Sequence, residues 1–230
     1  MQIKLAVSGL SLALALALAV APVAAAQSPG KPPKPDKPSA VTLDAKPAII
    51  VFSGATSLSG RLDGGGAGGV VIRLEQDATR PYGDSYTATG NTAMTANNGM
   101  YTIAVKPVVN TQYRVVAQTS PAVTSAAKLV RVRMRVGLGL SDTTPARGRL
   151  VRFSGSVSPA HDGRTAYIQR RSSTGGWVTV SRTTLRDAGT AKSTYSRRLR
   201  VSRDGVYRVK VLGDGDHSNG FSRMRSLAVH

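Results

Sequence analysis

Apolar and polar residues alternate in short runs along most of the chain. In YTIAVKP (residues 101–107), Tyr101, Ile103 and Val105 share one face of an extended strand, and the intervening residues take the other face. YRVKV (residues 207–211) repeats this alternation. After the N-terminal apolar run, no window of about eleven residues carries an apolar stripe with the period of a helix. The pattern therefore predicts an all-β protein.

The two halves of the chain repeat one another. Each half contains a Tyr-Arg-Val triplet inside an alternating run, in NTQYRVVA (residues 110–117) and in DGVYRVKV (residues 204–211). The matching residues are Tyr101 and Tyr195, Tyr113 and Tyr207, and Gly69 and Gly163, each 94 positions apart, and Gly60 and Gly155, 95 positions apart. Matching pairs in one order at nearly one offset indicate a tandem duplication.

The spacing of the strands predicts the fold of each half. About seven short strands in roughly 95 residues, bounded by Gly, Pro, Asp and Asn, fit an immunoglobulin-like antiparallel β-sandwich. We therefore expect two tandem sandwiches, at residues 41–135 and 136–230. They follow a predicted signal peptide at residues 1–26 and a Pro/Lys-rich spacer at residues 27–40.

The N-terminal segment predicts export. MQIK supplies a positive charge, LAVSGLSLALALALAV is apolar, and three alanines precede Gln27, which is the order of parts in a secretory signal peptide. The apolar run is short for a membrane span, and no later segment is apolar enough to form one. With no cysteine in the chain, neither a disulfide framework nor a lipid-modified cysteine is expected. The mature chain is expected to be secreted, or held non-covalently at the cell envelope.

The Tyr-Arg-Val triplets have a structural explanation. In immunoglobulin-like sandwiches, a tyrosine near the start of strand F hydrogen-bonds back to the main chain and forms a tyrosine corner. Tyr113 and Tyr207 occupy this position, and Val115 and Val209 follow two residues later, facing the core. We expect both tyrosines to be structural corner residues.

The second half also resembles a known family. FSGSVSPAHDGRTAYIQRR (residues 153–171), GGWVTV (residues 175–180) and DGVYRVKV (residues 204–211) are similar to the immunoglobulin-like or fibronectin-III-like repeats of exported actinobacterial proteins. The first half matches less closely, since Tyr86 falls near the position of Trp177. The resemblance implies extracellular scaffolding, adhesion or spacing, usually without catalysis.

Catalytic and metal-binding motifs are incomplete or missing. The chain has three histidines and no GxSxG, HExxH or paired-carboxylate motif, so we expect neither an enzyme nor a cofactor. In GDGDHSNG (residues 213–220), Asp214, Asp216 and Ser218 alternate as calcium ligands do. The glycine and the closing carboxylate of that motif are replaced by Asn219 and Arg225. An ordinary turn is favoured, and no metal is assigned.

The charge is strongly basic and unevenly divided. The chain has 31 Lys and Arg against 12 Asp and Glu, and residues 136–230 hold seventeen of the basic and six of the acidic residues, a net charge of +11. Residues 41–135 hold ten against five, a net charge of +5. We expect Arg152, Arg198 and Arg200 to form one outward basic patch, and Arg171, Arg208 and Lys210, beside Tyr167, to form another on the opposite sheet. Arginine suits phosphate and carboxylate groups because its planar fork binds them bidentately.

These observations leave three functional hypotheses. The leading one is a non-enzymatic exported module for binding or spacing, which associates with an anionic cell-wall polymer or envelope surface through the basic second domain. The alternative is a structural spacer or accessory subunit that recognises a protein partner through loops or edge-strand pairing. The third is a carbohydrate-binding module, for which Tyr167 and Trp177 are the candidate aromatic residues. Nucleic acid is disfavoured because aromatic stacking platforms are scarce.

Overall fold

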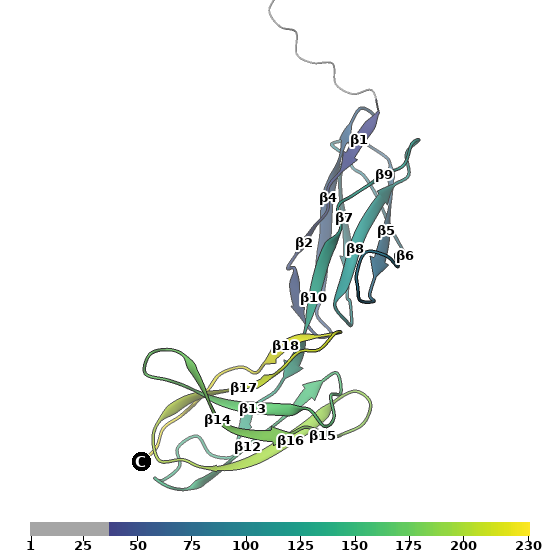
Figure 1. Ribbon diagram of the computed structural model, residues 1–230. Helices are drawn as coiled ribbons and strands as arrows, with labels where there is room; N and C mark the ends of the chain where they lie inside the picture. Colours follow the sequence, from purple (N-terminus) through teal and green to yellow (C-terminus); the bar gives the residue numbers. More distant parts are fainter. Residues whose placement is uncertain (1–36) are drawn as a thin grey trace, which may run out of the picture. The chain divides into compact units, whose positions relative to one another are not determined.

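The computed structural model describes residues 37–230, which are all-β (Figure 1). The predicted signal peptide and the spacer up to residue 36 lie outside the described residues. Within the described part of the chain, no helix is long and apolar enough to cross a membrane. The alternating sequence pattern explains the fold, because buried and exposed positions alternate along β7 (Met100–Val105) and β10 (Lys128–Val136).

The first sandwich packs two sheets around one core. The central strand of one sheet is β4 (Thr56–Gly64). It pairs antiparallel with β1 (Pro38–Val41), β2 (Asp44–Lys46) and β7. The facing sheet contains β3 (Ile49–Val51), β5 (Val71–Asp77), β6 (Thr87–Met94), β8 (Thr111–Ala117), β9 (Val123–Thr124) and the first part of β10. Their inner faces bury a cluster that includes Leu58, Leu62, Ile72 and Leu74.

The second sandwich repeats this arrangement around its own core. One sheet contains β11 (Gly139–Leu140), β12 (Leu150–Ser158), β15 (Arg186–Asp187) and β16 (Ser193–Arg200). The other contains β13 (Thr165–Arg171), β14 (Trp177–Thr184), β17 (Gly205–Val211), β18 (Ser218–Phe221) and β19 (Arg225–Leu227). The second core includes Phe153, Ile168 and Val209. The fold is thus two tandem immunoglobulin-like sandwiches, antiparallel except where β10 pairs parallel with β3 and with β18.

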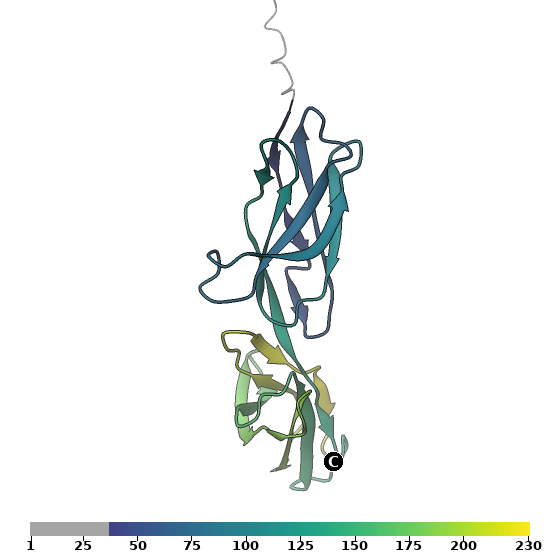
Figure 2. The same ribbon diagram turned by 90° about the vertical axis from the view of Figure 1, so that its right-hand side faces the viewer.

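Strand β10 is shared between the two sandwiches. It pairs with β8 through Lys128–Val130 and with β12 through Arg135 and Val136, so it passes from one core to the other without a loop (Figures 1 and 2). Its inward side chains belong to both cores: Val132 packs in the core of the first sandwich and Met134 in the core of the second.

The repeated glycine and tyrosine of the second sandwich form one contact. Gly155 on β12 lies opposite Tyr195 on β16. The Tyr195 hydroxyl donates to the main-chain carbonyl of Gly137 over a distance of 2.5 Å. A Cβ atom on Gly155 would lie 2.2 Å from that carbonyl oxygen, so the glycine leaves the space in which the tyrosine reaches its acceptor. Burial raises the pKa of the Tyr195 hydroxyl well above its usual value.

The first sandwich makes the same contact, which corrects the expected tyrosine corner. Gly60 lies opposite Tyr101, whose hydroxyl donates to the main-chain carbonyl of Thr42. The tether therefore belongs to Tyr101 and its counterpart Tyr195, and the assignment of it to Tyr113 and Tyr207 was wrong. Tyr113 and Tyr207 are instead core side chains with exposed fractions of 2% and 5%. Both kinds of tyrosine recur in the sequence because both occupy inward positions of strands.

The structure also shortens the predicted spacer. Residues 38–40, assigned to the spacer from their proline content, form the beginning of β1 and pair with β4. Pro38 is the first residue of this strand, a position where proline is tolerated because it need not donate to the sheet. Proline content alone therefore placed the boundary of the first sandwich too late.

Candidate anion-binding surface

Three arginines lie together on the outward face of the β12–β16 pair. Arg152 is directly opposite Arg198 in the antiparallel register, and Arg200 follows two residues later on the same face, opposite Leu150. All three arginines are exposed. The Arg200 guanidinium donates to the main-chain carbonyl of Gly148 over 2.7 Å. We call Arg152, Arg198 and Arg200 the β12–β16 face.

Like charges facing each other across a strand pair cost stability unless something neutralises them. Within the described part of the second sandwich, Arg164 is the one lysine or arginine with a carboxylate oxygen within 4.0 Å. The β12–β16 face therefore has no internal acidic partner. Arg152 and Arg198 keep their hydrogen-bonding forks available to an external anion, whereas Arg200 uses one of its N–H groups for the Gly148 carbonyl.

In the first sandwich, several basic side chains are paired with acidic ones. Five of its basic side chains lie within 4.0 Å of a carboxylate oxygen: Lys46, Arg61, Arg73, Arg114 and Lys128. Glu75 illustrates the pattern, since its carboxylate accepts from Arg73 and Arg114 over 2.7 Å each. Burial raises the pKa of Glu75, but the hydrogen bonds from Arg114 and Arg73 outweigh it and hold the pKa below its usual value. The unpaired basic surface is thus concentrated in the second sandwich.

A second basic face lies on β13 and β17, and it is interleaved with aromatic rings. The register places Tyr167 opposite Lys210 and Arg171 opposite Trp177. The Arg208 guanidinium lies 4.0 Å from the Trp177 ring centroid. We call Arg171, Arg208, Lys210, Tyr167 and Trp177 the β13–β17 face.

Arg208 differs from its neighbours on the β13–β17 face. Its guanidinium is also 4.7 Å from the ring centroid of Phe221, and its Nε donates to the side-chain oxygen of Gln169 over 2.9 Å. Burial lowers the pKa of Arg208. The expected role of Arg208 in anion binding is therefore offset by its packing against two rings. Phe221 was missed from the sequence because SNGF carries no alternating pattern.

A row of arginines on β10 was not predicted from the sequence. Arg131, Arg133 and Arg135 alternate with buried residues and are exposed. Together with Arg80 and Phe221, Arg131 and Arg133 line an open groove of about 450 Å³. The alternation in VRVRMRV carried the signal for this row, but it was interpreted only as the junction between the halves.

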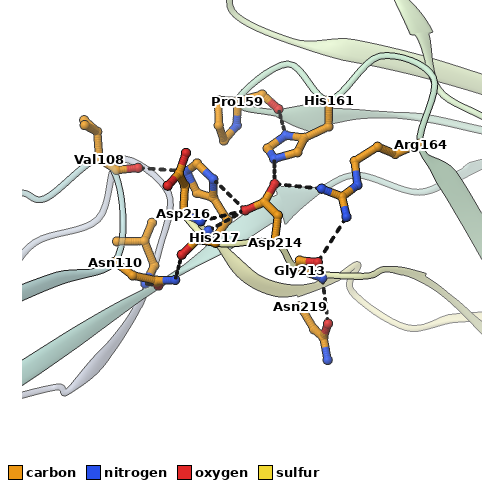
Figure 3. A network of polar contacts seen from close by, with 12 residues as sticks. Val108, Asn110, Pro159, His161, Arg164, Gly213, Asp214, Asp216, His217 and Asn219 are labelled. Carbon is orange, nitrogen blue, oxygen red and sulfur yellow. Dashed lines mark hydrogen bonds and ion pairs between the residues drawn. The ribbon is translucent and has the colours of Figure 1, made fainter. Parts of the chain in front are cut away.

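The incomplete calcium motif is a closed turn around Asp214. One carboxylate oxygen of Asp214 accepts from the main-chain N–H groups of Asp216 and His217, at 3.0 and 2.7 Å. The other oxygen accepts from Arg164 at 2.8 Å and lies 3.1 Å from a ring nitrogen of His161 (Figure 3). Burial raises the pKa of Asp214. The hydrogen bonds from the two main-chain N–H groups and the neighbouring histidines have a larger, opposite effect, so the pKa lies below its usual value. This carboxylate is surrounded by main-chain N–H groups, Arg164 and two histidine rings, and among the described residues the side chains of Asp216 and Ser218 form no hydrogen bond with it.

Comparisons with known proteins assign the chain to no family. No family model matches the sequence, and no curated protein matches it. Among solved structures, the chain is similar to a tetra-tandem repeat in the extending region of a large adhesion protein, with 16% identity and a TM-score of 0.32 over 83% of this chain and 48% of that one. It is also similar to a marsupial T cell receptor, with 8% identity and a TM-score of 0.34 over 83% of this chain and 73% of that one. The chain spans about half the length of the adhesion-protein structure that it matches, and the fold assignment rests on the strand pairing and the two cores.

Proposed function

We propose that this chain is a non-enzymatic exported module that binds anionic polymers of the cell envelope through the β12–β16 face. The main support for the proposal is the direct cross-strand pairing of Arg152 with Arg198, beside Arg200, while no carboxylate of residues 37–230 forms a salt bridge with any of them. Phosphate and carboxylate groups along a polymer would neutralise this repulsion, and each planar guanidinium can bind them bidentately.

The distribution of charge supports the same proposal. A general compositional bias toward arginine would act on both halves of a duplicated chain, yet the second half carries a net charge of +11 and the first half +5. Among the described residues, the first sandwich also pairs several of its lysines and arginines with acids, whereas the second pairs one. Selection for an anion-binding surface on the second sandwich accounts for both differences.

Co-sedimentation with isolated bacterial cell envelopes tests the proposal. The chain from Gln27 onward is mixed with envelopes at NaCl concentrations from roughly 50 to 500 mM, over which electrostatic screening shortens from about 14 to about 4 Å. The parent chain is compared with a variant in which Arg152, Arg198 and Arg200 are all serine. We expect binding to fall with salt and to be weakened at least about tenfold in the variant at low salt.

A charge-matched control separates a specific face from general basicity. Arg147, Lys192 and Arg223 are exposed residues of the second sandwich outside both basic faces, and changing them to serine removes the same charge. The control should retain most of the binding. Equal loss in both triple variants would reduce the proposal to net charge alone. Binding that resists salt and survives both triple variants would overturn it in favour of a protein partner, for which β14 offers an edge strand with the exposed residues Val178 and Val180.

Carbohydrate binding through the β13–β17 face is a second candidate, favoured by the aromatic rings gathered there. The rings of Trp177 and Phe221 both contact the Arg208 guanidinium, and Tyr167 lies on the same face. Sugar rings pack against aromatic faces, and this contact depends little on salt. Trp177→Ala should abolish such binding while leaving the salt-sensitive binding intact. Unchanged glycan binding in Trp177→Ala would exclude this face as the carbohydrate site.

A further inference from the structure

Two loops of the second sandwich bring the side chains of His161, Asp214 and His217 together. His161 follows β12, and Asp214 and His217 lie between β17 and β18. One ligand-type atom from each of the three residues can be chosen so that all three atoms lie within 4.8 Å of one another. The two imidazole rings meet edge to face, with their centroids 5.1 Å apart (Figure 3).

The hydrogen bonds of His161 define which of its ring nitrogens is free. Its Nδ1 lies 2.8 Å from the main-chain carbonyl oxygen of Pro159, which only accepts, so Nδ1 carries the proton and donates. In the neutral ring, Nε2 then carries a lone pair. This Nε2 lies 3.1 Å from a carboxylate oxygen of Asp214. In the neutral ring, two hydrogen-bond acceptors therefore face each other with no proton between them.

His217 repeats this arrangement with the opposite ring nitrogen. Its Nε2 lies 2.9 Å from the main-chain carbonyl oxygen of Val108 and donates to it. Its Nδ1 is buried and has no hydrogen-bond partner among the described residues. This atom lies 3.7 Å from the other carboxylate oxygen of Asp214, and the whole residue is 6% exposed. A buried, unpartnered polar atom of this kind calls for a missing partner.

We propose that His161 Nε2, His217 Nδ1 and the Asp214 carboxylate bind one divalent metal ion of borderline softness, with zinc as the best fit. Two imidazole nitrogens and one carboxylate oxygen form a common zinc ligand set, and an open position remains for water or an external ligand. Ligands about 2.0–2.1 Å from a tetrahedral zinc ion lie about 3.3 Å from one another. The observed separations, 3.1 Å from His161 to one Asp214 carboxylate oxygen and 3.7 Å from His217 to the other, are close to this value, and one ligand atom from each residue lies within 4.8 Å of the other two.

The surroundings of the three ligands match those of metal sites. Each histidine donates its other ring N–H to a main-chain carbonyl, and this contact fixes the tautomer and the orientation of a metal-binding imidazole. Arg164 donates to the Asp214 carboxylate and to the carbonyl of Gly213, which holds the carboxylate in place. Asp214 and His217 also line the groove of about 450 Å³, which provides a path for the ion.

The proposed site has a structural consequence beyond its own loop. The N–H of Asn110, in the first sandwich, donates to the carbonyl of Asp216 over 2.7 Å, and Val108 accepts from His217. An ion held by His161 and His217 would therefore also stabilise the contacts between residues 108–110 and the loop that contains Asp214. Zinc binding is expected to raise the thermal stability of the whole described unit.

Titration of the chain from Gln27 onward with ZnCl2 tests the proposal. Isothermal calorimetry should show one zinc ion per chain, and EDTA should reverse the binding. Nitrogen-15 NMR of the histidine rings should show zinc-dependent shifts at His161 Nε2 and His217 Nδ1, with His230 unaffected. The NMR measurement needs no substitution, so it remains informative even where a variant fails to fold.

Two variants and one control complete the test. Asp214→Asn keeps an oxygen that can accept the main-chain N–H groups, and His161→Gln keeps a polar side chain. Each should weaken zinc binding at least tenfold. His230→Gln is the control and should bind zinc as the parent does. No zinc binding, binding confined to His230, or equal affinity in the parent and Asp214→Asn would overturn the proposal; the cluster would then be an ion-paired network with protonated histidines.

Discussion

Replacing Gly155 with alanine tests the contact that both sandwiches share. An alanine Cβ would lie 2.2 Å from the carbonyl oxygen of Gly137 and 2.8 Å from the Tyr195 hydroxyl. Ordinary contact begins at 3.4 Å, so β12 and the chain at Gly137 would have to separate by about 1.2 Å. The backbone carbonyl cannot rotate away as a flexible side chain would.

The cost of that separation follows from what it disturbs. The shift lengthens the hydrogen bond from Tyr195 to Gly137, now 2.5 Å, and the one from the Gly137 N–H to the Ser156 carbonyl, now 2.8 Å. Overpacking a closed site costs about 1–3 kcal/mol, and each weakened hydrogen bond adds up to about 1 kcal/mol. We expect Gly155→Ala to lower the free energy of unfolding by about 3 kcal/mol.

Urea unfolding followed by tryptophan fluorescence measures this change. Trp177 is the single tryptophan of the chain, and it lies in the second sandwich, stacked on Arg208. Gly139→Ala is the matched control, because a Cβ there would meet its nearest atom, the Ser154 carbonyl oxygen, at an ordinary 3.6 Å. The control should stay within about 0.5 kcal/mol of the parent. Equal stability of Gly155→Ala and the parent would refute the reasoning.

Three further predictions concern single side chains. Tyr195→Phe removes only the hydroxyl, and should lower the free energy of unfolding by about 1 kcal/mol in the same urea assay. Arg152→Glu places a carboxylate opposite Arg198, so it should stabilise the fold by a few tenths of a kcal/mol while reducing envelope binding; a destabilised variant would contradict the repulsion inferred for this pair. The pKa of Glu75 is lowered in the folded state, so its stabilising effect exists above the unfolded-state pKa and is lost as the pH falls through the folded-state pKa. The difference in unfolding free energy between the parent and Glu75→Gln should therefore shrink between pH 7 and pH 3, and a difference independent of pH would contradict this.

Much of the fold could be predicted because apolar and polar residues alternate along the individual strands. A strand that buries every second residue shows its inner face directly in the sequence, as β10 does with Val130, Val132 and Met134. The duplication also indicated that the strands follow the same order in both halves. The offset between Tyr101 and Tyr195 arises because both occupy the same position opposite a repeated glycine.

The tyrosine tether was assigned to the wrong strand for a physical reason. Tyr195 and Tyr207 both stand at inward positions of alternating runs, and alternation cannot tell which hydroxyl reaches a carbonyl. That depends on the strand opposite, where Gly155 leaves room beside Tyr195. Register between distant strands therefore decided the outcome, and sequence alone does not specify it.

The candidate sites were only partly visible for a related reason. Arg152 and Arg198 could be placed on neighbouring strands from the sandwich topology alone. The histidine cluster could not be recognised, because His161 and Asp214 are far apart in sequence and both lie in loops. Loops have no period that predicts which side chains meet, so contacts of this kind are seen only once the fold is known.

The affinity of the chain for a purified anionic wall polymer, measured against salt, tests the proposed function most directly. The dissociation constant for teichoic acid would be compared between the parent, the serine variant of Arg152, Arg198 and Arg200, and the charge-matched control. We expect the affinity to fall at least about tenfold between roughly 50 and 500 mM NaCl, and to be lost selectively in the variant of the β12–β16 face. Equal affinity of all three proteins, or affinity unchanged by salt, would contradict it.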